Sequence, residues 1–215
     1  MTVVSGQSAS FTVNATGTGT LSYQWKRGTT NVGTNSQTLT INPATPADAG
    51  SYMVVVTDST GSTNSSAATL TVNVPATINT PPSSVTAIQG QTATFTVVAG
   101  GTTPFTYAWK QGTVPVGTNS PTLTINPVLT SSAGTYTVTV TNVANPSGAS
   151  ASATLTVTPA TPPAITTPPV ATTAIQGQSA TFTVVASGST PLTYVWKQGT
   201  TVVGGNSPTL TINPV

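Results

Sequence analysis

The sequence has very few charged residues and lacks three chemically versatile residue types. Glutamate, histidine and cysteine are absent from the 215 residues. A globular chain of this length would carry about fifty charged side chains, whereas this one has six: Lys26, Arg27, Asp48, Asp58, Lys110 and Lys197. Metal sites need histidine, cysteine or clustered carboxylates, and catalysis needs a titratable group or an activated nucleophile. We therefore expect no catalytic, cofactor-binding or metal-binding residues and no enzyme activity.

The low charge also limits the partners. The net charge of +2 comes from scattered cations, which are too few to neutralise a run of phosphates, so we expect no nucleic-acid binding. No stretch reaches the apolar length of a membrane span. The first ten residues lack the cationic and apolar regions of a signal peptide, so any export signal is expected outside this sequence. Without cysteine, no disulfide forms.

Threonine, serine, glycine, asparagine and 18 prolines fill much of the sequence, and 36% of the residues are hydrophobic. Mean hydropathy is +0.14. Disordered chains are usually low in hydrophobicity and high in net charge. This composition, together with regularly placed apolar residues, predicts an ordered chain.

Three similar segments repeat along the chain. GQSASFTV, GQTATFTV and GQSATFTV are each followed by Tyr-x-Trp-Lys and then by TLTINP. A spacing of about 85 residues between them suits a small domain. We therefore predict three domains, at residues 1–74, 75–160 and 161–215.

Each repeat has the alternating pattern of half-buried antiparallel strands. Ala93, Phe95 and Val97, for example, alternate with Thr94 and Thr96, and threonine suits the solvated face of a sheet. Clusters of glycine, proline, asparagine and serine between the runs are typical of turns. No helical period occurs. Several short strands with two faces to bury predict an all-β fold of β-sandwich domains.

The order of the motifs resembles the immunoglobulin-like domain in its cysteine-free bacterial surface version. That order is GQ, a strand, Tyr-x-Trp-Lys, TLTI, Ala-Gly-x-Tyr-x-Val and ATLTV. The resemblance implies tandem Greek-key sandwiches whose strand C carries the core tryptophans Trp25, Trp109 and Trp196. It also implies that Tyr52 and Tyr136 are tyrosine corners. The paired cysteine positions of antibody-type domains are then occupied by Val13 with Val54 and by Val97 with Val138, so packing replaces a covalent bond.

The resemblance also predicts incomplete domains at both ends. Val215 aligns with Val128, so the third repeat lacks counterparts of residues 129–157, which include strands F and G. The first repeat begins at the equivalent of Val85, so its first strand is expected to be incomplete. Two interpretations remain open: the sequence is a stretch of a longer array, or another chain completes the third domain by strand addition.

The few candidate site residues have structural interpretations. Asp48 is expected to order the turn entering strand F, because Ser132 takes its place in the second repeat. The lysine after each tryptophan is expected to be solvated. The linkers VNVPATINTPPS and VTPATPPAITTPPV have no carboxylate for calcium, and their prolines predict stiff, extended spacers. Glycans on threonine and serine are a hypothesis, and Asn14 and Asn64 lie in N-glycosylation patterns.

These observations favour a structural protein. We expect a stretch of an extracellular or cell-surface filament of tandem immunoglobulin-like domains. It would associate with copies of itself and with adjoining domains through uncharged faces and strand edges. One alternative is an adhesin stalk or binding module that spaces a recognition tip. A second is an accessory module of a secreted enzyme or phage virion protein.

Overall fold

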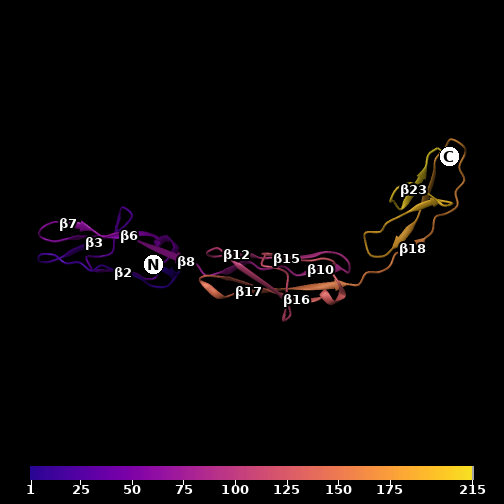
Figure 1. Ribbon diagram of the computed structural model, residues 1–215. Helices are drawn as coiled ribbons and strands as arrows, with labels where there is room; N and C mark the ends of the chain where they lie inside the picture. The colour runs from indigo at the N-terminus through magenta and orange to yellow at the C-terminus, as the bar shows by residue number, and fades with distance from the viewer. Residues whose placement is uncertain (215) are drawn as a thin grey trace. The chain divides into compact units, whose positions relative to one another are not determined.

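A computed structural model describes residues 1–214 of the chain (Figure 1). Val215, the last residue of the third predicted domain, lies outside the described residues. Residues 1–214 form strands β1 to β23 and two short 3-10 turns, and they contain no α-helix. The predicted all-β fold is therefore confirmed.

The first repeat contains two sheets. In the larger one the strand order is β1, β8, β6, β3, β4, with β7 also paired to β6. The bounds are β1 Thr2–Val4, β3 Ser22–Arg27, β4 Thr30–Val32, β6 Gly50–Thr57, β7 Ser62–Asn64 and β8 Ala68–Asn73. The smaller sheet pairs β2 (Ala9–Thr12) with β5 (Thr38–Ile41), and the turn η1 covers Pro46–Asp48.

The second repeat has the same strand order, here β10, β17, β16, β13, β14. The bounds are β10 Val85–Ile88, β13 Thr106–Gln111, β14 Val114–Val116, β16 Gly134–Asn142 and β17 Asn145–Thr158. Two further pairs join β11 (Ala93–Thr96) to β15 (Thr122–Ile125) and β12 (Val98–Gly100) to β9 (Thr77–Thr80). The turn η2 covers Thr130–Ser132. Strand β1 runs parallel to β8 and β10 runs parallel to β17, whereas β3 and β13, the strands that carry the tryptophans, pair antiparallel with β6 and β16.

The third repeat consists of three strand pairs. These are β18 (Ala164–Thr167) with β20 (Val185–Ser187), β19 (Ala180–Thr183) with β23 (Thr209–Ile212), and β21 (Trp196–Gln198) with β22 (Thr201–Val203). Strands β3 and β13 are each paired on both sides, by β4 and β6 and by β14 and β16. Within the described part of the chain, β21 pairs with β22 alone, so this repeat shows no counterpart of β6 and β8.

The prediction that the two proline-rich linkers are stiff, extended spacers is partly wrong. Residues 77–80 and 164–167 lie in the proline-rich linkers, yet they form β9 and β18. Strand β9 pairs with β12, and β18 pairs with β20. The unpaired backbone groups of such an edge strand favour an added strand. Proline lacks the N–H donor of a ladder bond, but the prolines flank these strands and do not interrupt them. Only the residues just before β9 and just before β18 therefore remain as connections between consecutive repeats.

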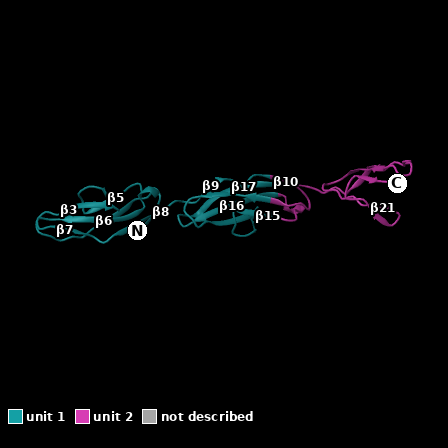
Figure 2. Ribbon diagram, turned by 90° about the horizontal axis from the view of Figure 1, so that it is seen from above, with its two compact units in different colours: residues 1–84, 94–124, 134–154 teal, residues 85–93, 125–133, 155–215 magenta. Residues whose placement is uncertain are grey.

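The chain divides into two compact units whose boundaries cut across the repeats (Figure 2). One contains residues 1–84, 94–124 and 134–154, and the other contains residues 85–93, 125–133 and 155–215. The teal unit holds the first repeat and most of the paired strands of the second. The magenta unit holds β10, η2 and the strands of the third repeat.

The cores of the first two repeats lie between their sheets and consist of equivalent residues. The register pairs Trp25 with Val54 and Trp109 with Val138. The largest fully buried side chains are Trp109 and Phe95. Alternate residues of β6 and β16 are buried from Tyr52 and Tyr136 onward, so the period-two pattern of the sequence corresponds to packing in these strands.

Candidate functional site

Each of the first two cores is built around three aromatic rings. Phe95 stacks on Tyr136 with ring centroids 5.0 Å apart and lies 6.3 Å from Trp109. The first repeat reproduces this arrangement, with Phe11 at 5.1 Å from Tyr52 and 6.4 Å from Trp25. All six rings are buried. They therefore stabilise the sandwiches and offer no face to a ligand.

The Asn-Ser motif that precedes each TLTI strand anchors the strand bearing the tryptophan. The indole nitrogens of Trp25, Trp109 and Trp196 each donate to a serine carbonyl at 2.9 Å, on Ser36, Ser120 and Ser207. The side chains of Asn35, Asn119 and Asn206 each accept a backbone N–H at 2.7 Å. The sequence showed this motif almost unchanged in all three repeats, but its anchoring role went unrecognised there.

The structure places the four valines of the cysteine positions in the two sandwich cores. Val54 and Val138 are 0% exposed and Val97 is 2% exposed. Val13 is partly buried and packs against the first core. The proposed correspondence with a cysteine pair remains a prediction.

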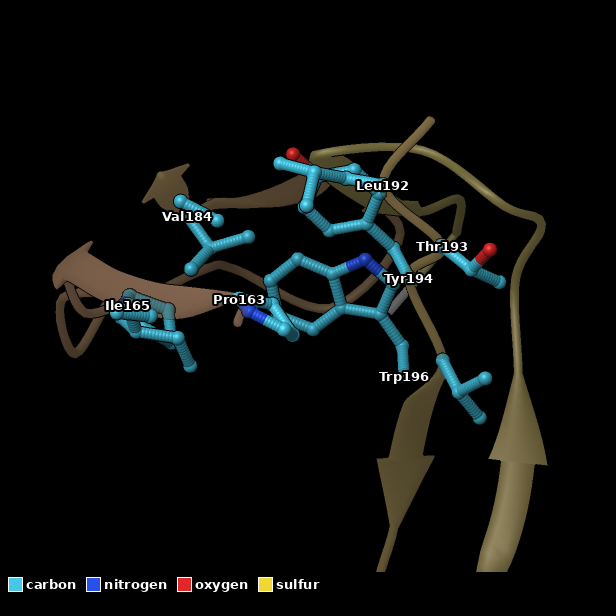
Figure 3. Close-up of a pocket in the computed structure, with 11 residues that line it drawn as sticks. Pro163, Ile165, Val184, Leu192, Thr193, Tyr194 and Trp196 are labelled. Carbon is cyan, nitrogen blue, oxygen red and sulfur yellow. The ribbon is translucent and has the colours of Figure 1, made fainter. Parts of the chain in front are cut away.

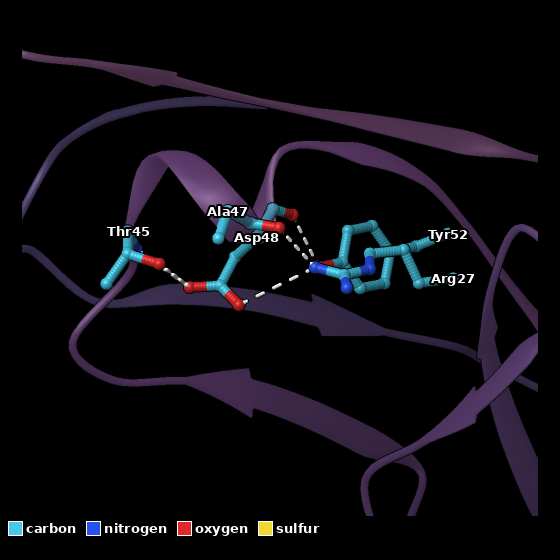
Figure 4. A network of polar contacts seen from close by, with 5 residues as sticks. All are labelled: Arg27, Thr45, Ala47, Asp48 and Tyr52. Carbon is cyan, nitrogen blue, oxygen red and sulfur yellow. Dashed lines mark hydrogen bonds and ion pairs between the residues drawn. The ribbon is translucent and has the colours of Figure 1, made fainter.

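The turn before β6 holds a polar network centred on Asp48 (Figure 4). One carboxylate oxygen accepts from the Thr45 backbone N–H at 2.8 Å and from its hydroxyl at 2.7 Å. The Arg27 guanidinium lies 3.7 Å from the other oxygen and donates to the Ala47 carbonyl. The Tyr52 hydroxyl donates to the Asp48 carbonyl at 2.6 Å. The hydrogen bonds from Thr45, together with Arg27, lower the pKa of the Asp48 carboxyl.

This network orders a turn, as the sequence predicts. In the second repeat Gln111 and Ser132 stand where Arg27 and Asp48 stand in the first. The Ser132 hydroxyl oxygen accepts from the Leu129 backbone N–H at 3.1 Å, so a neutral residue takes over the same task. The two repeats therefore order the same turn in different ways, one with an ion pair and one with neutral residues.

Asp58 closes the turn between β6 and β7. Its carboxylate accepts from the backbone N–H groups of Thr18, Thr60 and Gly61 and from the Thr60 hydroxyl, at 2.6–3.1 Å. The Thr60 hydroxyl, followed by the backbone donors of Thr18 and Thr60, lowers the pKa of Asp58 from 3.8 to about 2. Asn142 occupies the equivalent place in the second repeat. No role for Asp58 or Asn142 was predicted from the sequence, although the match of TVTN to VVTD aligns the two residues.

An apolar hollow of about 410 Å³ lies beside Trp196 in the third repeat (Figure 3). Pro163, Ile165, Val184, Leu192, Tyr194 and Trp196 contribute to its lining. Trp196 is partly exposed beside the hollow, whereas Trp109 is 2% exposed. In the second repeat β16 pairs with β13, the strand that carries Trp109, whereas β21, which carries Trp196, has no such neighbour among the described residues.

No group of three or more potential metal ligands exists among residues 1–214. None of the helices described in this part of the chain has the length and apolarity to span a bilayer.

Comparisons with known proteins agree with this architecture. Residues 1–72 match the immunoglobulin I-set domain, and residues 75–142 match an immunoglobulin domain family. Residues 1–72 and 75–142 therefore form tandem immunoglobulin-like domains. Their cores contain no disulfide, because the chain has no cysteine.

Solved structures with the same fold are multidomain arrays. The I-band fragment I67-I69 from titin aligns with all of this chain and 85% of its own length, at 19% identity and a TM-score of 0.62. The immunoglobulin domains 1–5 of Sidekick-1 align with all of this chain and 51% of theirs, at 23% identity and 0.69. The N-terminal four Ig domains of Dscam1 isoform 6.9 cover 74% of this chain and 43% of theirs, at 31% identity and 0.56. Such arrays fit a structural or adhesion-type role.

Proposed function

We propose that the chain is a structural segment of an extracellular or cell-surface filament, without catalytic activity, that associates with copies of itself. The observation that supports this most strongly is the uncharged threonine surface of the small sheets. Strand β11 exposes Thr94 and Thr96, and β15 exposes Thr122 and Thr124. We call these four residues the threonine face of the second repeat.

Equivalent faces occur in the other repeats. In the first, Ser10 pairs with Thr40 and Thr12 with Thr38 across β2 and β5. In the third, Thr181 pairs with Thr211 and Thr183 with Thr209. The strands that carry these faces have no charged residue. Charge is a common means by which proteins keep sheets apart, so these faces lack electrostatic repulsion between copies.

The edges of the small sheets support the same proposal. In the sheets formed by the described residues, β5, β15 and β23 each pair with one strand only. An edge strand presents backbone N–H and C=O groups to which a second chain can add. A neutral face beside a neutral edge therefore favours lateral association.

Sedimentation velocity at increasing concentration tests this proposal. Thr94→Lys combined with Thr124→Lys introduces two cations on the threonine face, whereas Thr113→Lys with Thr118→Lys introduces the same charge on exposed turns. We expect the wild-type chain and the turn variant to form concentration-dependent polymers and the face variant to stay monomeric. A monomeric wild-type chain at all concentrations, or equal behaviour of the two variants, would contradict the proposal.

A second candidate is an adhesion stalk that spaces a recognition tip. It is supported by the 31% identity to the Dscam1 array. A stalk needs spacing without self-association, so a monomeric wild-type chain in the same experiment would favour it. A third proposal, an accessory module of a secreted enzyme or virion protein, has no specific support among the described residues.

Glycans on the exposed hydroxyls would add to either role. Asn14 and Asn64 are both exposed, as are most threonines of the small sheets. Intact-mass measurement of native material tests this, because a mass equal to that of the bare chain would exclude glycosylation.

A further inference from the structure

The end of β16 carries Asn142, the one polar residue that is buried among residues 1–214. Its Oδ1 accepts from the backbone N–H groups of Ala144 at 3.1 Å and Asn145 at 2.9 Å, which closes the turn to β17. Turn closure needs only an acceptor, and the carboxylate of Asp58 supplies one in the first repeat. The Asn142 amide nitrogen is therefore free for a second task.

That nitrogen holds the segment that enters the second repeat. Asn142 Nδ2 donates to the carbonyl oxygens of Val74 and Thr102, both at 2.8 Å. Its Oδ1 also accepts from the Ala76 backbone N–H at 3.1 Å. A second amide adds to this contact, because Asn145 Nδ2 donates to the Ala76 carbonyl at 3.1 Å. A buried amide with all these partners is a strong local constraint, since breaking it leaves buried polar groups unpaired.

Thr102 and Gly101 complete the site. The Val74 backbone N–H donates to the Thr102 hydroxyl oxygen at 2.8 Å, and the Thr102 N–H donates to the Val74 carbonyl at 3.0 Å. Gly101 has a positive φ of 114°, and a Cβ there would lie 2.4 Å from the Pro75 carbonyl oxygen. The close approach of Pro75 therefore requires glycine at position 101.

In the connection between the first and second repeats, no residue lies between the last hydrogen bond to the first repeat and the first hydrogen bond to the second. Asn73, the last residue of β8, accepts from the Ser5 backbone N–H at 2.8 Å and so belongs to the first repeat. The next residue, Val74, is already bonded to Thr102 and Asn142 in the second.

The connection between the second and third repeats is longer. The Thr158 carbonyl is bonded within the second repeat, and the next anchored position is Thr161, whose N–H donates to the Ser189 hydroxyl oxygen at 2.8 Å. Pro159 and Ala160 lie between these positions. Ser189 corresponds to Thr102, but the described part of the third repeat has no counterpart of Asn142. The side chain of Gln91 donates to the Thr190 carbonyl at 3.3 Å, but this bond is exposed to water, which reduces its contribution.

We propose that Asn142 is a clamp that makes the connection at residues 73–76 stiff, and that the chain bends at Pro159–Ala160. The stiffness of each connection is then set by two features, the clamp and the number of unanchored residues. This inference does not depend on self-association.

Distance distributions between spin labels on the whole chain test the clamp, and the absence of native cysteine allows clean labelling. Labels at Thr40→Cys and Thr124→Cys report on the first connection, and labels at Thr124→Cys and Thr211→Cys report on the second. We expect the first distribution to be at most half as wide as the second. Equal widths in the wild-type chain would overturn the proposal.

Two changes at the first connection sharpen the test. Asn142→Asp keeps the turn acceptor, as in the first repeat, but removes the donor to Val74. Insertion of Pro-Ala between Asn73 and Val74 reproduces the length of the second connection. Each is expected to widen the first distribution at least twofold, and an unchanged width in either would contradict the proposal.

A control and a substitute variant keep the result interpretable. Asp58→Asn makes the reverse change at a turn that holds no connecting segment among the described residues, so both distributions should stay unchanged. Should Asn142→Asp unfold the second repeat by circular dichroism, Asn142→Ser replaces it, because a neutral hydroxyl oxygen still offers an acceptor to the turn but the amide donor to Val74 and Thr102 is removed. An unchanged width in that variant would overturn the clamp.

Discussion

The indole nitrogen of Trp109 donates to the carbonyl oxygen of Ser120 at 2.9 Å. The same bond recurs between Trp196 and Ser207, although the two indoles differ in burial. The bond therefore depends on the local loop and not on completion of the core around the ring.

Trp109→Ala should destabilise the second repeat by about 3–5 kcal/mol, the usual effect of deleting a buried aromatic side chain. Trp196→Ala should destabilise the third repeat by less, because the indole is partly exposed beside the hollow. Amide hydrogen exchange of each repeat in the whole chain measures both effects. Equal losses in the two repeats would show that the loop bond, and not burial, dominates.

Tyr52→Phe removes the hydrogen bond to the Asp48 carbonyl and keeps the ring stacked on Phe11. We expect the free energy of unfolding of the first repeat to fall by about 1 kcal/mol, as for a single hydrogen bond. Urea unfolding monitored by amide exchange at Val54 measures it, with Thr40→Val as an exposed control. An unchanged stability would show that the tyrosine corner contributes through its ring alone.

Val97→Cys combined with Val138→Cys should form a disulfide under oxidising conditions, if these valines occupy the paired cysteine positions. The stabilisation expected is about 2–4 kcal/mol. Mass spectrometry after thiol alkylation detects the bond. Val97→Cys with Val140→Cys is the matched control, because it shifts one partner along β16 to the next inward position. Alkylation of both thiols in the first variant would refute the correspondence.

The stability of the first repeat should change with pH only in acid. Hydrogen bonds lower the pKa of Asp58 from 3.8 to about 2, and the pKa of Asp48 is also lowered. A carboxyl with a lowered folded pKa stabilises the fold above its unfolded pKa and loses that contribution as pH falls through the folded pKa. We therefore expect constant stability from pH 9 to about 4 and a decline from about 4 to 2.

The second repeat is an internal control for this decline, because residues 75–160 contain no Asp or Glu. Its amide exchange, corrected for intrinsic rates, should give a constant stability across the same acid range. A parallel decline in both repeats would show that the two carboxylates are not its cause.

The alternation around Phe95 and Trp109 made the sandwich predictable, because a strand with one buried face has a two-residue period. The turn role of Asp48 could also be predicted, since its partner Thr45 lies three residues away. The role of Asn142 could not, because its contact with Val74 joins residues 68 positions apart. The strand at residues 77–80 was likewise missed, since flanking prolines are typical of both spacers and edge strands.

Intermolecular paramagnetic relaxation enhancement tests the central claim of self-association most directly. Isotope-labelled wild-type chain is mixed with unlabelled chain that carries a spin label at Thr124→Cys. We predict enhanced relaxation of amides in β11, β15 and the equivalent strands of the other repeats, increasing with concentration. Uniformly unaffected amides at the highest concentration, or enhancement confined to surfaces outside the small sheets, would contradict the proposal.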